Sequence, residues 1–388
     1  KKLLYFLTPH ERKRAGLLLI MILIMALLDT IGVASILPLI AVLANPSVIE
    51  TNIFLNKMFQ ASAVFGVESI QHFLFFLGAF VFVILISSIS FKALTTYAQK
   101  RFTDMRQFTV GKRLIEAYLE QPYSWFLNHN SADLGKTILS EVEQVIAGGI
   151  GPFLELIARS LIVFLLITLL IIIDPKLAVI VGISLGAAYF LIYYFTRVYL
   201  NRVGGERLKN NELRFRSISE AFGAAKEVKV GGLEQVYVKR FSDPAERFAK
   251  INSSFAVISS LPRYFLEAIA FGGILIIILF MMSQTGSINN ALPILGLYVF
   301  AGYRLLPALQ RIYASLTQLA FVRSALDKLY YEVKNIEYCN PIQTKKVLKL
   351  DKEITLNNIH FNYPNSSRTA LKNISLNIPA KSTVAFVG

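Results

Sequence analysis

Two arginines interrupt an otherwise apolar segment of this 388-residue chain. Arg304 and Arg311 are seven residues apart, so on a helix they share one face, two turns apart. At 1.5 Å per residue, Arg304 lies about 20 Å from the start of its apolar run near Ala291. A guanidinium there needs a carboxylate or a wet cavity, and its two-pronged geometry suits phosphate oxygens. The pattern favours phosphate binding. For these two arginines, and for Arg263, the alternatives are snorkelling to the inner headgroups or pairing with Glu267 and Asp327.

A carboxylate raises the same question at the other end of the chain. Asp29 is the only charged residue in the apolar run 16–44. An acid inside an apolar span is a functional candidate by default. The alternative is structural, with Asp29 facing a neighbouring helix and hydrogen-bonded there, since burying a carboxylate without a partner is costly.

The composition places these charges in a membrane protein. Hydrophobic residues make up 54% of the chain and charged residues 17%, against about 25% charged in soluble domains. The formal charge of +15 is spread over basic stretches between apolar runs, as in cytoplasmic membrane flanks, which excludes a soluble nucleic-acid binder. Cys339 is the only cysteine, which excludes an internal disulfide and a cysteine-based metal site, and no metal site is predicted.

Six apolar runs predict the elements that position these residues. The expected spans cover about 16–44, 69–95, 152–173, 177–198, 262–283 and 291–312, after an amphipathic interfacial helix over 1–14. The basic segments fall on one side and the charge-poor turns on the other, which puts both termini in the cytoplasm. The predicted fold is therefore an all-α polytopic membrane protein, with a membrane domain over 1–335 and a linker over 336–350.

The helices are predicted to extend far beyond the membrane. A helix over 69–120 would be about 75 Å long, more than twice the hydrocarbon thickness. Two breaks, at about 121–134 and 225–236, end the long helical pairs on the cytoplasmic side. The first break displays Tyr123, Trp125 and Phe126, and the second contains Gly231 and Gly232.

The segment between the first two spans has a pattern of its own. Residues 45–68 carry one basic residue, and Phe54, Leu55, Met58 and Phe59 fall at helical spacing. This predicts a short helix at about 52–60 on the outer membrane surface. A structured loop without a helix is the alternative.

The last segment, 351–388, is typical of a soluble domain. Ile354, Leu356, Ile359 and Phe361 alternate with polar residues, as strands do, and a second set follows over 371–378. The final run, 383–388, predicts an apolar strand that ends at Gly388. A strand that ends in glycine is how the phosphate-binding loop G-x-x-x-x-G-K-[ST] begins.

The stretch LKNISLNI followed by VAFVG resembles the start of an ATP-binding-cassette nucleotide domain, and the whole chain resembles an exporter-type ABC transporter. The resemblance implies a homodimer that uses ATP and Mg²⁺, bound mainly beyond the residues present. It places Tyr363 against adenine and Gly388 at the start of the Walker A loop. It also makes the two breaks coupling helices, with ordinary helix-end packing as the alternative for Tyr123 and Trp125. The full-length protein would be a transport ATPase. This chain holds only the first strands of an α/β nucleotide domain, without the Walker A lysine, Walker B or signature motif, so alone it is not expected to hydrolyse ATP.

Three further stretches are similar to PglK-type lipid-linked oligosaccharide flippases: SSLPRYFLEAIAF (259–271), YVFAGYRLLPALQRIYAS (298–315) and SFKALTTYA (90–98). The resemblance implies a basic cavity for a pyrophosphate, lined by Lys92, Arg263, Arg304 and Arg311. Lys92 stands where an arginine is expected, and it keeps the charge but not the fork.

The function implied is an ATP-driven flippase for a polyprenyl-pyrophosphate saccharide in the bacterial inner membrane. An exporter of another amphiphile, such as a glycolipid, a lipid A-like lipid, a peptide or a drug, is the alternative. A non-transporting membrane scaffold is a distant one.

Overall fold

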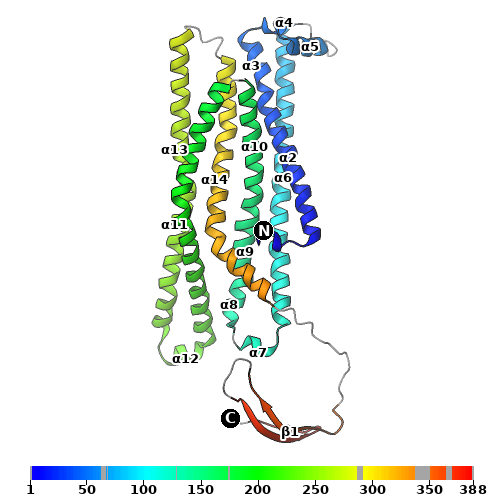
Figure 1. Cartoon of the computed structure of the whole chain (residues 1–388), viewed down its shortest axis with the longest axis vertical. Helices are drawn as coiled ribbons and strands as arrows, with labels where there is room; N and C mark the ends of the chain where they lie inside the picture. The colour runs from blue at the N-terminus through cyan, green and yellow to red at the C-terminus, as the bar shows by residue number, and fades with distance from the viewer. Residues whose placement is uncertain are drawn as a thin grey trace.

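The computed structural model describes residues 2–62, 67, 69–127, 129–173, 175–285, 292–336, 350–363 and 369–386. Long helices form a bundle, and a two-stranded sheet follows them in the chain (Figure 1). Several helices begin or end in an apolar run and continue, without a break, through polar sequence.

The N-terminal segment differs from its prediction. Instead of one interfacial helix over 1–14, α1 (Lys2–Tyr5) is followed by a break and by α2 (Pro9–Ala34). Thr8 caps α2 in a capping box with Glu11, and Pro9 occupies the first turn, where its missing N–H costs nothing. These local signals start the helix well before the apolar run.

A second break divides the first predicted span. The helix α2 ends at Ala34 and α3 (Ile36–Ala44) begins two residues later. Pro38 lies in the first turn of α3, where proline is tolerated. The hydroxyl of Ser35 donates to the carbonyl of Gly32 at 2.9 Å. Two short helices follow, α4 (Val48–Thr51) and α5 (Ile53–Ser62).

The next helix, α6 (Ile70–Leu119), agrees with the predicted 69–120 helix to within a residue at each end. The hydroxyl of Ser69 accepts the backbone N–H of His72 and caps its start. Pro122 follows its end, which is where a helix cannot continue.

The returning helix contains turns that the sequence pattern did not predict. After α7 (Tyr123–Phe126), a continuous helical segment runs through α8 (Ser131–Lys136), the π-helical turn η2 (Thr137–Glu141), α9 (Val142–Val145), the π-helical turn η3 (Ile146–Ile150) and α10 (Gly151–Ile173). The remaining helices are α11 (Pro175–Gly223), α12 (Ala225–Val230), α13 (Glu234–Thr285) and α14 (Leu292–Asn335).

Three helical stretches of the described chain are long and apolar enough to cross a membrane: Pro9–Leu43, Ile70–Leu119 and Ser131–Ile173. The helices α11, α13 and α14 contain the other three apolar runs. Their assignment as spans stays a prediction.

The bundle is held together by α14, which packs against α10, α11 and α13. The helices α2 and α6 form a second pair that contacts α10. One apolar core includes Ile22, Ile162, Leu166 and Leu305, and a second includes Phe6, Leu114, Val145 and Leu329. The short helices α4 and α5 lie at one end of the bundle, and α7 and α12 lie at the other (Figure 1).

The sheet pairs β1 (Glu353–Phe361) with β2 (Leu371–Pro379) in antiparallel fashion. Leu356 lies opposite Leu376, and Ile359 lies opposite Ile374. Between these pairs Asn358 has a φ of 52°, and the register shifts there, which is the irregularity of a β-bulge.

The predicted final strand is absent from the described residues, because 383–386 form no ladder with β1 or β2. A strand requires a hydrogen-bonded neighbour. Gly388 lies outside the described residues.

Candidate functional site

The carboxylate of Asp29 joins three helices in the apolar part of the bundle. Its Oδ1 atom accepts from a guanidinium nitrogen of Arg304 at 2.5 Å. The same oxygen accepts from the hydroxyl of Ser88 at 3.3 Å. The Asp29 side chain is 2% exposed and that of Arg304 is 16% exposed. Helices α2, α6 and α14 therefore meet at a buried ion pair.

A second cation shares the carboxylate. The Nζ atom of Lys92, on α6, lies 3.8 Å from Asp29 Oδ2. Its side chain is 30% exposed, so it forms the open side of the group. Lys92 also lies in the electrostatic field of Arg159 and Glu155, which pair with each other on α10 at 2.9 Å.

We call Asp29, Lys92, Glu155, Arg159 and Arg304 the charged cluster. It holds three cations and two carboxylates, so it has a surplus of positive charge. In an apolar surrounding such a surplus attracts an anion, and the arginines offer paired N–H donors to phosphate oxygens.

The structure brings together two of the four predicted cavity residues. Lys92 and Arg304 share Asp29. Arg263 instead pairs with Glu267 one turn along α13, at 2.8 Å, and its side chain is 62% exposed. Arg311 is exposed, and no ion pair to it is found within the described residues.

The partner of Arg304 differs from those expected, whereas Arg263 pairs with Glu267, one of the two expected alternatives. Arg304 pairs with Asp29 rather than with Glu267 or Asp327, while Asp327 pairs with Lys2. The expectation that Asp29 is hydrogen-bonded against a neighbouring helix is confirmed by its contact with Ser88. Pairing across 275 positions of sequence depends on the fold, and no local pattern reveals it.

Glu155 and Arg159 were missed as members of the cluster. The signal was present, because the two charges stand four residues apart at the start of an apolar run. Charges inside such a run are candidates on the same ground as Asp29.

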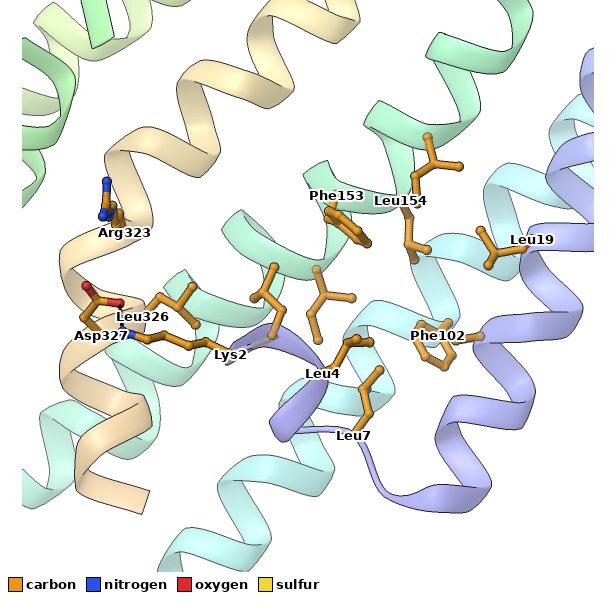
Figure 2. Close-up of a pocket in the computed structure, with 14 residues that line it drawn as sticks. Lys2, Leu4, Leu7, Leu19, Phe102, Phe153, Leu154, Arg323, Leu326 and Asp327 are labelled. Carbon is orange, nitrogen blue, oxygen red and sulfur yellow. Dashed lines mark hydrogen bonds and ion pairs between the residues drawn. The ribbon is translucent and has the colours of Figure 1, made fainter. Parts of the chain in front are cut away.

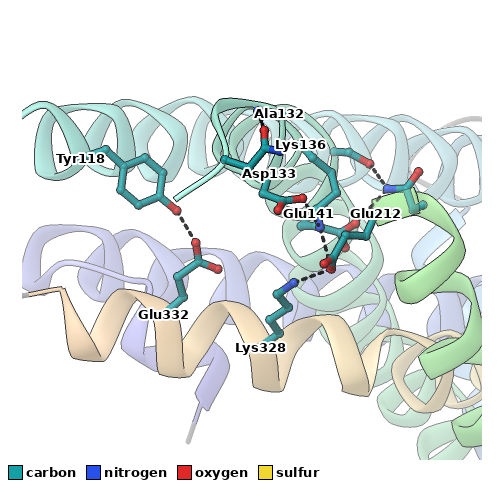
Figure 3. Close-up of polar contacts among 11 residues, drawn as sticks. Tyr118, Ala132, Asp133, Lys136, Glu141, Glu212, Lys328 and Glu332 are labelled. Carbon is teal, nitrogen blue, oxygen red and sulfur yellow. Dashed lines mark hydrogen bonds and ion pairs between the residues drawn. The ribbon is translucent and has the colours of Figure 1, made fainter. Parts of the chain in front are cut away.

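A second polar network lies among α6, α8, α11 and α14, in their parts outside the predicted spans (Figure 3). Glu212 accepts from Lys136 at 3.1 Å and from Lys328 at 2.8 Å. The Lys136 side chain is fully buried. Burial alone would raise the pKa of Glu212, but the hydrogen bonds from the two lysines outweigh it and hold the pKa below the usual 4.5.

Tyr118, near the end of α6, contacts Glu332 near the end of α14. The hydroxyl of Tyr118 donates to Glu332 at 2.5 Å. Burial is the main cause that raises the pKa of Tyr118 well above its usual 10, and the Glu332 carboxylate adds to it.

The two predicted coupling segments contain short helices, α7 and α12, at the same end of the bundle (Figure 1). Trp125 stacks on His129, with ring centroids 3.7 Å apart, and on Tyr118 at 5.6 Å. Phe126 contacts Trp125 edge-on. Tyr123, in contrast, is 75% exposed. The geometry of Trp125 is that of helix-end packing, and Tyr123 is the aromatic side chain of α7 that is free to meet a partner.

The glycines of the second segment serve the turn between α12 and α13. Gly232 has a φ of +61°, which favours glycine. A Cβ on Gly231 would lie 3.0 Å from the carbonyl oxygen of Glu227. Val230, just before them, is 82% exposed.

Three apolar side chains of α5 pack against other parts of the protein. Leu55 is 3% exposed, and Met58 and Phe59 pack beside it. Phe59 contacts Phe73 of α6 edge-on, with centroids 5.1 Å apart. Phe54 is 64% exposed, so of the four predicted residues it alone is well exposed.

Tyr363 follows β1 and is 41% exposed. Its ring and that of Phe361 form a T-shaped pair with centroids 5.0 Å apart. Within the described residues, no group of three or more His, Cys, Asp or Glu side chains could hold a metal ion.

Residues 17–303 match the protein family described as "ABC transporter transmembrane region". The chain is also similar to proteins named "ATP-dependent lipid A-core flippase". It is 24% identical to that of Ralstonia nicotianae over 287 residues, 71% of this chain and 46% of the relative. For Cupriavidus metallidurans the identity is 25% over 281 residues, with the same coverage. For Albidiferax ferrireducens it is 23% over 304 residues, 76% of this chain and 50% of the relative. The chain thus spans about half the length of these relatives.

Proposed function

The chain belongs to the family of ABC transporter transmembrane regions, and from that premise we propose that it is the membrane domain of an ATP-driven exporter of anionic lipids. In the finer form of the proposal, the substrate is a polyprenyl-pyrophosphate saccharide. The exporter works as a homodimer with six spans per chain in the bacterial inner membrane, and both termini lie in the cytoplasm. Residues 1–335 form the membrane domain, and the segment from 351 begins the nucleotide domain.

The observation that carries the proposal is the excess of positive charge in the charged cluster, whose residues lie within the predicted spans. Arg304 and Lys92 converge on one carboxylate, with Arg159 close to them. A pyrophosphate brings more negative charge than Asp29 and fits the fork of a guanidinium. The proposed step is therefore an exchange, in which the headgroup takes over Arg304 and Lys92 from Asp29.

The lipid tail requires no polar site, because the outward faces of α2 and α6 are apolar and exposed, as at Leu17, Ile20 and Phe82. The tail stays in the bilayer, while the headgroup crosses along the basic residues. Arg263 and Arg311, which are exposed, would receive the headgroup before or after the cluster.

ATP binding would close the two nucleotide domains and supply the energy for the change of access. Tyr363 would stack on the adenine, since it is 41% exposed. The coupling segments, 121–134 and 225–236, would pass the movement to the helices.

A second candidate substrate is the lipid A-core, because the three relatives compared above bear that name. Both candidates are anionic lipids with a saccharide, so the charged cluster alone does not separate them.

The test is ATP-dependent translocation in proteoliposomes that contain the full-length protein. Each substrate is supplied separately, and movement is followed by protection from an external enzyme or quencher. We expect the polyprenyl-pyrophosphate saccharide to be moved and Arg304→Glu to abolish its movement. Movement of the lipid A-core alone would transfer the function to the second candidate. Full activity of Arg304→Glu would refute the site.

A matched control separates loss of substrate binding from loss of folding. Arg202 is exposed and pairs with Glu206 one turn along α11, away from the charged cluster. Arg202→Glu should leave both folding and translocation close to those of the unmodified protein. Residual ATP hydrolysis by Arg304→Glu would show that its nucleotide domains remain intact.

A further inference from the structure

A pocket of about 440 Å³ lies between α1 and the bundle, separate from the charged cluster (Figure 2). Its size falls in the range of small-molecule sites, about 300–1,000 Å³. The walls come from α1, α2, α6, η3, α10 and α14. All lining residues but Lys2, Arg323 and Asp327 are apolar. The apolar walls include Leu4, Leu19, Phe102, Phe153 and Leu154.

The walls of this pocket remain partly open. Leu4 is 49% exposed, and Leu19 and Phe153 are each 41% exposed. Apolar surface of this kind in a concave site gains free energy when another apolar group covers it. The pocket is thus built to take up an apolar group.

The position of the pocket along the helices identifies its surroundings. Leu19 lies at the start of the first predicted span, and Phe153 and Leu154 lie at the start of the third. Phe102 lies seven residues beyond the end of the second predicted span, about 10 Å further into the cytoplasm. The pocket therefore straddles the predicted inner boundary of the membrane, where acyl chains meet headgroups.

The charges at the pocket have the sign that an anionic lipid needs. Lys2 pairs with Asp327 at 2.7 Å and lies over the ring of Tyr331. Arg323 is exposed, and within the described residues no ion pair to it is found. Arg12, Lys13 and Arg14 are exposed on the first turns of α2, and the Arg12 guanidinium donates to the carbonyl of Leu4 on α1.

From these features we infer that the pocket under α1 binds one acyl chain of an anionic phospholipid of the cytoplasmic leaflet, with the lipid phosphate at Arg323. Lys2 and Asp327 close the pocket on the polar side, and α1 covers the chain. Anionic lipids are concentrated on the cytoplasmic leaflet, and basic residues near that surface attract them. The site lies outside the charged cluster, and the inference does not depend on which substrate is transported.

A photoreactive phospholipid tests the inference in the full-length protein. Nanodiscs of phosphatidylcholine are prepared with a trace of phosphatidylglycerol or of phosphatidylcholine, each carrying a photoreactive group in its acyl chain. After irradiation, labelled peptides are identified by mass spectrometry. We expect labels at Phe102 or over 150–157, and more of them from phosphatidylglycerol.

Two variants address the tail and the headgroup separately. Leu4→Trp fills the pocket from its exposed edge, and it should remove the labels for both lipids. Arg323→Gln removes the proposed phosphate contact, and it should lower the preference for phosphatidylglycerol about fivefold, the effect of one basic residue near a membrane surface. Arg202→Gln, on the exposed part of α11, is the matched control and should change neither.

Four outcomes would overturn the inference. The first is an absence of acyl labels at these residues in the folded, unmodified protein. The second is labelling that Leu4→Trp leaves unchanged. The third is a crosslink from position 4 to a second copy of the chain, which would make that copy the occupant. Protection of Arg323 from chemical modification by inorganic phosphate, without acyl labelling, would point to a free anion and would also refute a lipid.

Discussion

Among single residues, the carboxylate of Asp29 brings two cations together in the apolar part of the bundle. It is 2% exposed and is shared by Arg304 and Lys92. A buried ion pair gains little over a well-packed apolar pair, but removing one partner leaves an uncompensated charge. The pair therefore holds α2 to α14 while the proposed headgroup is absent. In the proposed exchange, the contact between Asp29 and Arg304 breaks when the headgroup binds.

A double-mutant cycle between Asp29 and Arg304 measures this dependence. We expect Asp29→Asn to lower the free energy of unfolding by about 3–5 kcal/mol, because it leaves the guanidinium of Arg304 without its carboxylate. Arg304→Gln should cost somewhat less, because Asp29 keeps the more distant cation of Lys92. The double variant should lose less than the sum, with a coupling of about 0.5–3 kcal/mol. Thermal unfolding in detergent provides the measurement.

The exposed pair Arg263 and Glu267 is the internal control for that cycle. Their side chains are 62% and 41% exposed, and they are one turn apart on α13. Water screens such pairs, so their coupling should be about 0.3–0.5 kcal/mol. Equal couplings for the two pairs would contradict the burial of Asp29.

The sequence identified individual candidate residues of the site but not the contacts between them. Charges in apolar runs identified Asp29 and Arg304, because burial makes each of them costly alone. The pairing of the two was not predictable, since it joins the first and last long helices of the bundle. Arg263 stands in a similar context in the sequence but pairs within its own helix.

Among elements, the contact between α11 and α14 is the closest that the described glycines make. A Cβ on Gly204 would lie 2.1 Å from the backbone carbonyl oxygen of Phe321. Backbone atoms cannot move aside as a flexible side chain can, so the helices would have to separate. Gly205 is one residue away, and a Cβ there would lie 3.6 Å from Ser324, an ordinary contact.

The neighbouring glycines supply a matched pair of variants. Gly204→Ala should lower the free energy of unfolding by about 1–3 kcal/mol or more through overpacking. Gly205→Ala should be neutral or stabilising by up to about 1 kcal/mol, because alanine favours a helix. Thermal unfolding of both variants decides the matter, and equal behaviour would refute the close approach of α11 and α14.

The polar network around Glu212 predicts a pH dependence. A lowered carboxyl pKa contributes stability above the unfolded value of 4.5, and that contribution is lost as the pH falls through the folded pKa. For Lys328, burial lowers the pKa, but the contact with Glu212 outweighs it and raises the pKa above 10.5, so its contribution is lost only as the pH rises beyond that value. The contact is fully formed between the two limits.

We expect the melting temperature to fall as the pH drops below about 4.5, and to fall less in Glu212→Gln. Glu246→Gln is the control, because Glu246 is exposed and pairs with Lys250 one turn away, where screening leaves little stabilisation. If the glutamine variants at 212 and 246 show the same pH profile, the network does not carry the effect.

Helix ends were predictable where the sequence has strong local signals. Pro122 marks the end of α6, which ends within a residue of its predicted limit. The break between α2 and α3 and the π-helical turns η2 and η3 were not predicted. In η3 a Cβ on Gly148 would lie 2.7 Å from the side chain of Gln318 on α14, so tertiary packing contributes to the shape of that turn.

For the whole molecule, the arrangement separates the three proposed sites along the bundle. The charged cluster occupies the apolar part, the pocket under α1 lies at the predicted inner boundary, and α7 and α12 lie at the end opposite α5 (Figure 1). Helices such as α6, with 50 residues, connect the levels directly. A rigid helix of this length can carry a movement from one level to another without a chain of intermediate loops.

The proposed coupling at α7 yields the last prediction, in which neighbouring aromatic residues behave differently. Tyr123 is 75% exposed, so Tyr123→Ala should change stability by less than about 0.5 kcal/mol. It should nevertheless lower the translocation per ATP hydrolysed by about tenfold if Tyr123 anchors the nucleotide domain. Trp125→Ala should instead lower stability by about 1–3 kcal/mol, because it loses two stacked aromatic contacts.

The two readouts are thermal unfolding and the ratio of lipid translocation to ATP hydrolysis in proteoliposomes of the full-length protein. Leu139 is the control, since it is 69% exposed on η2, outside both coupling segments, and Leu139→Ala should alter neither readout. An unchanged ratio for Tyr123→Ala would remove Tyr123 from the coupling contact. The proposed coupling contact would then pass to the second segment, which also has exposed apolar side chains such as Val230. In the proposed mechanism, the movement reaches the helices through the end of the bundle where both segments lie.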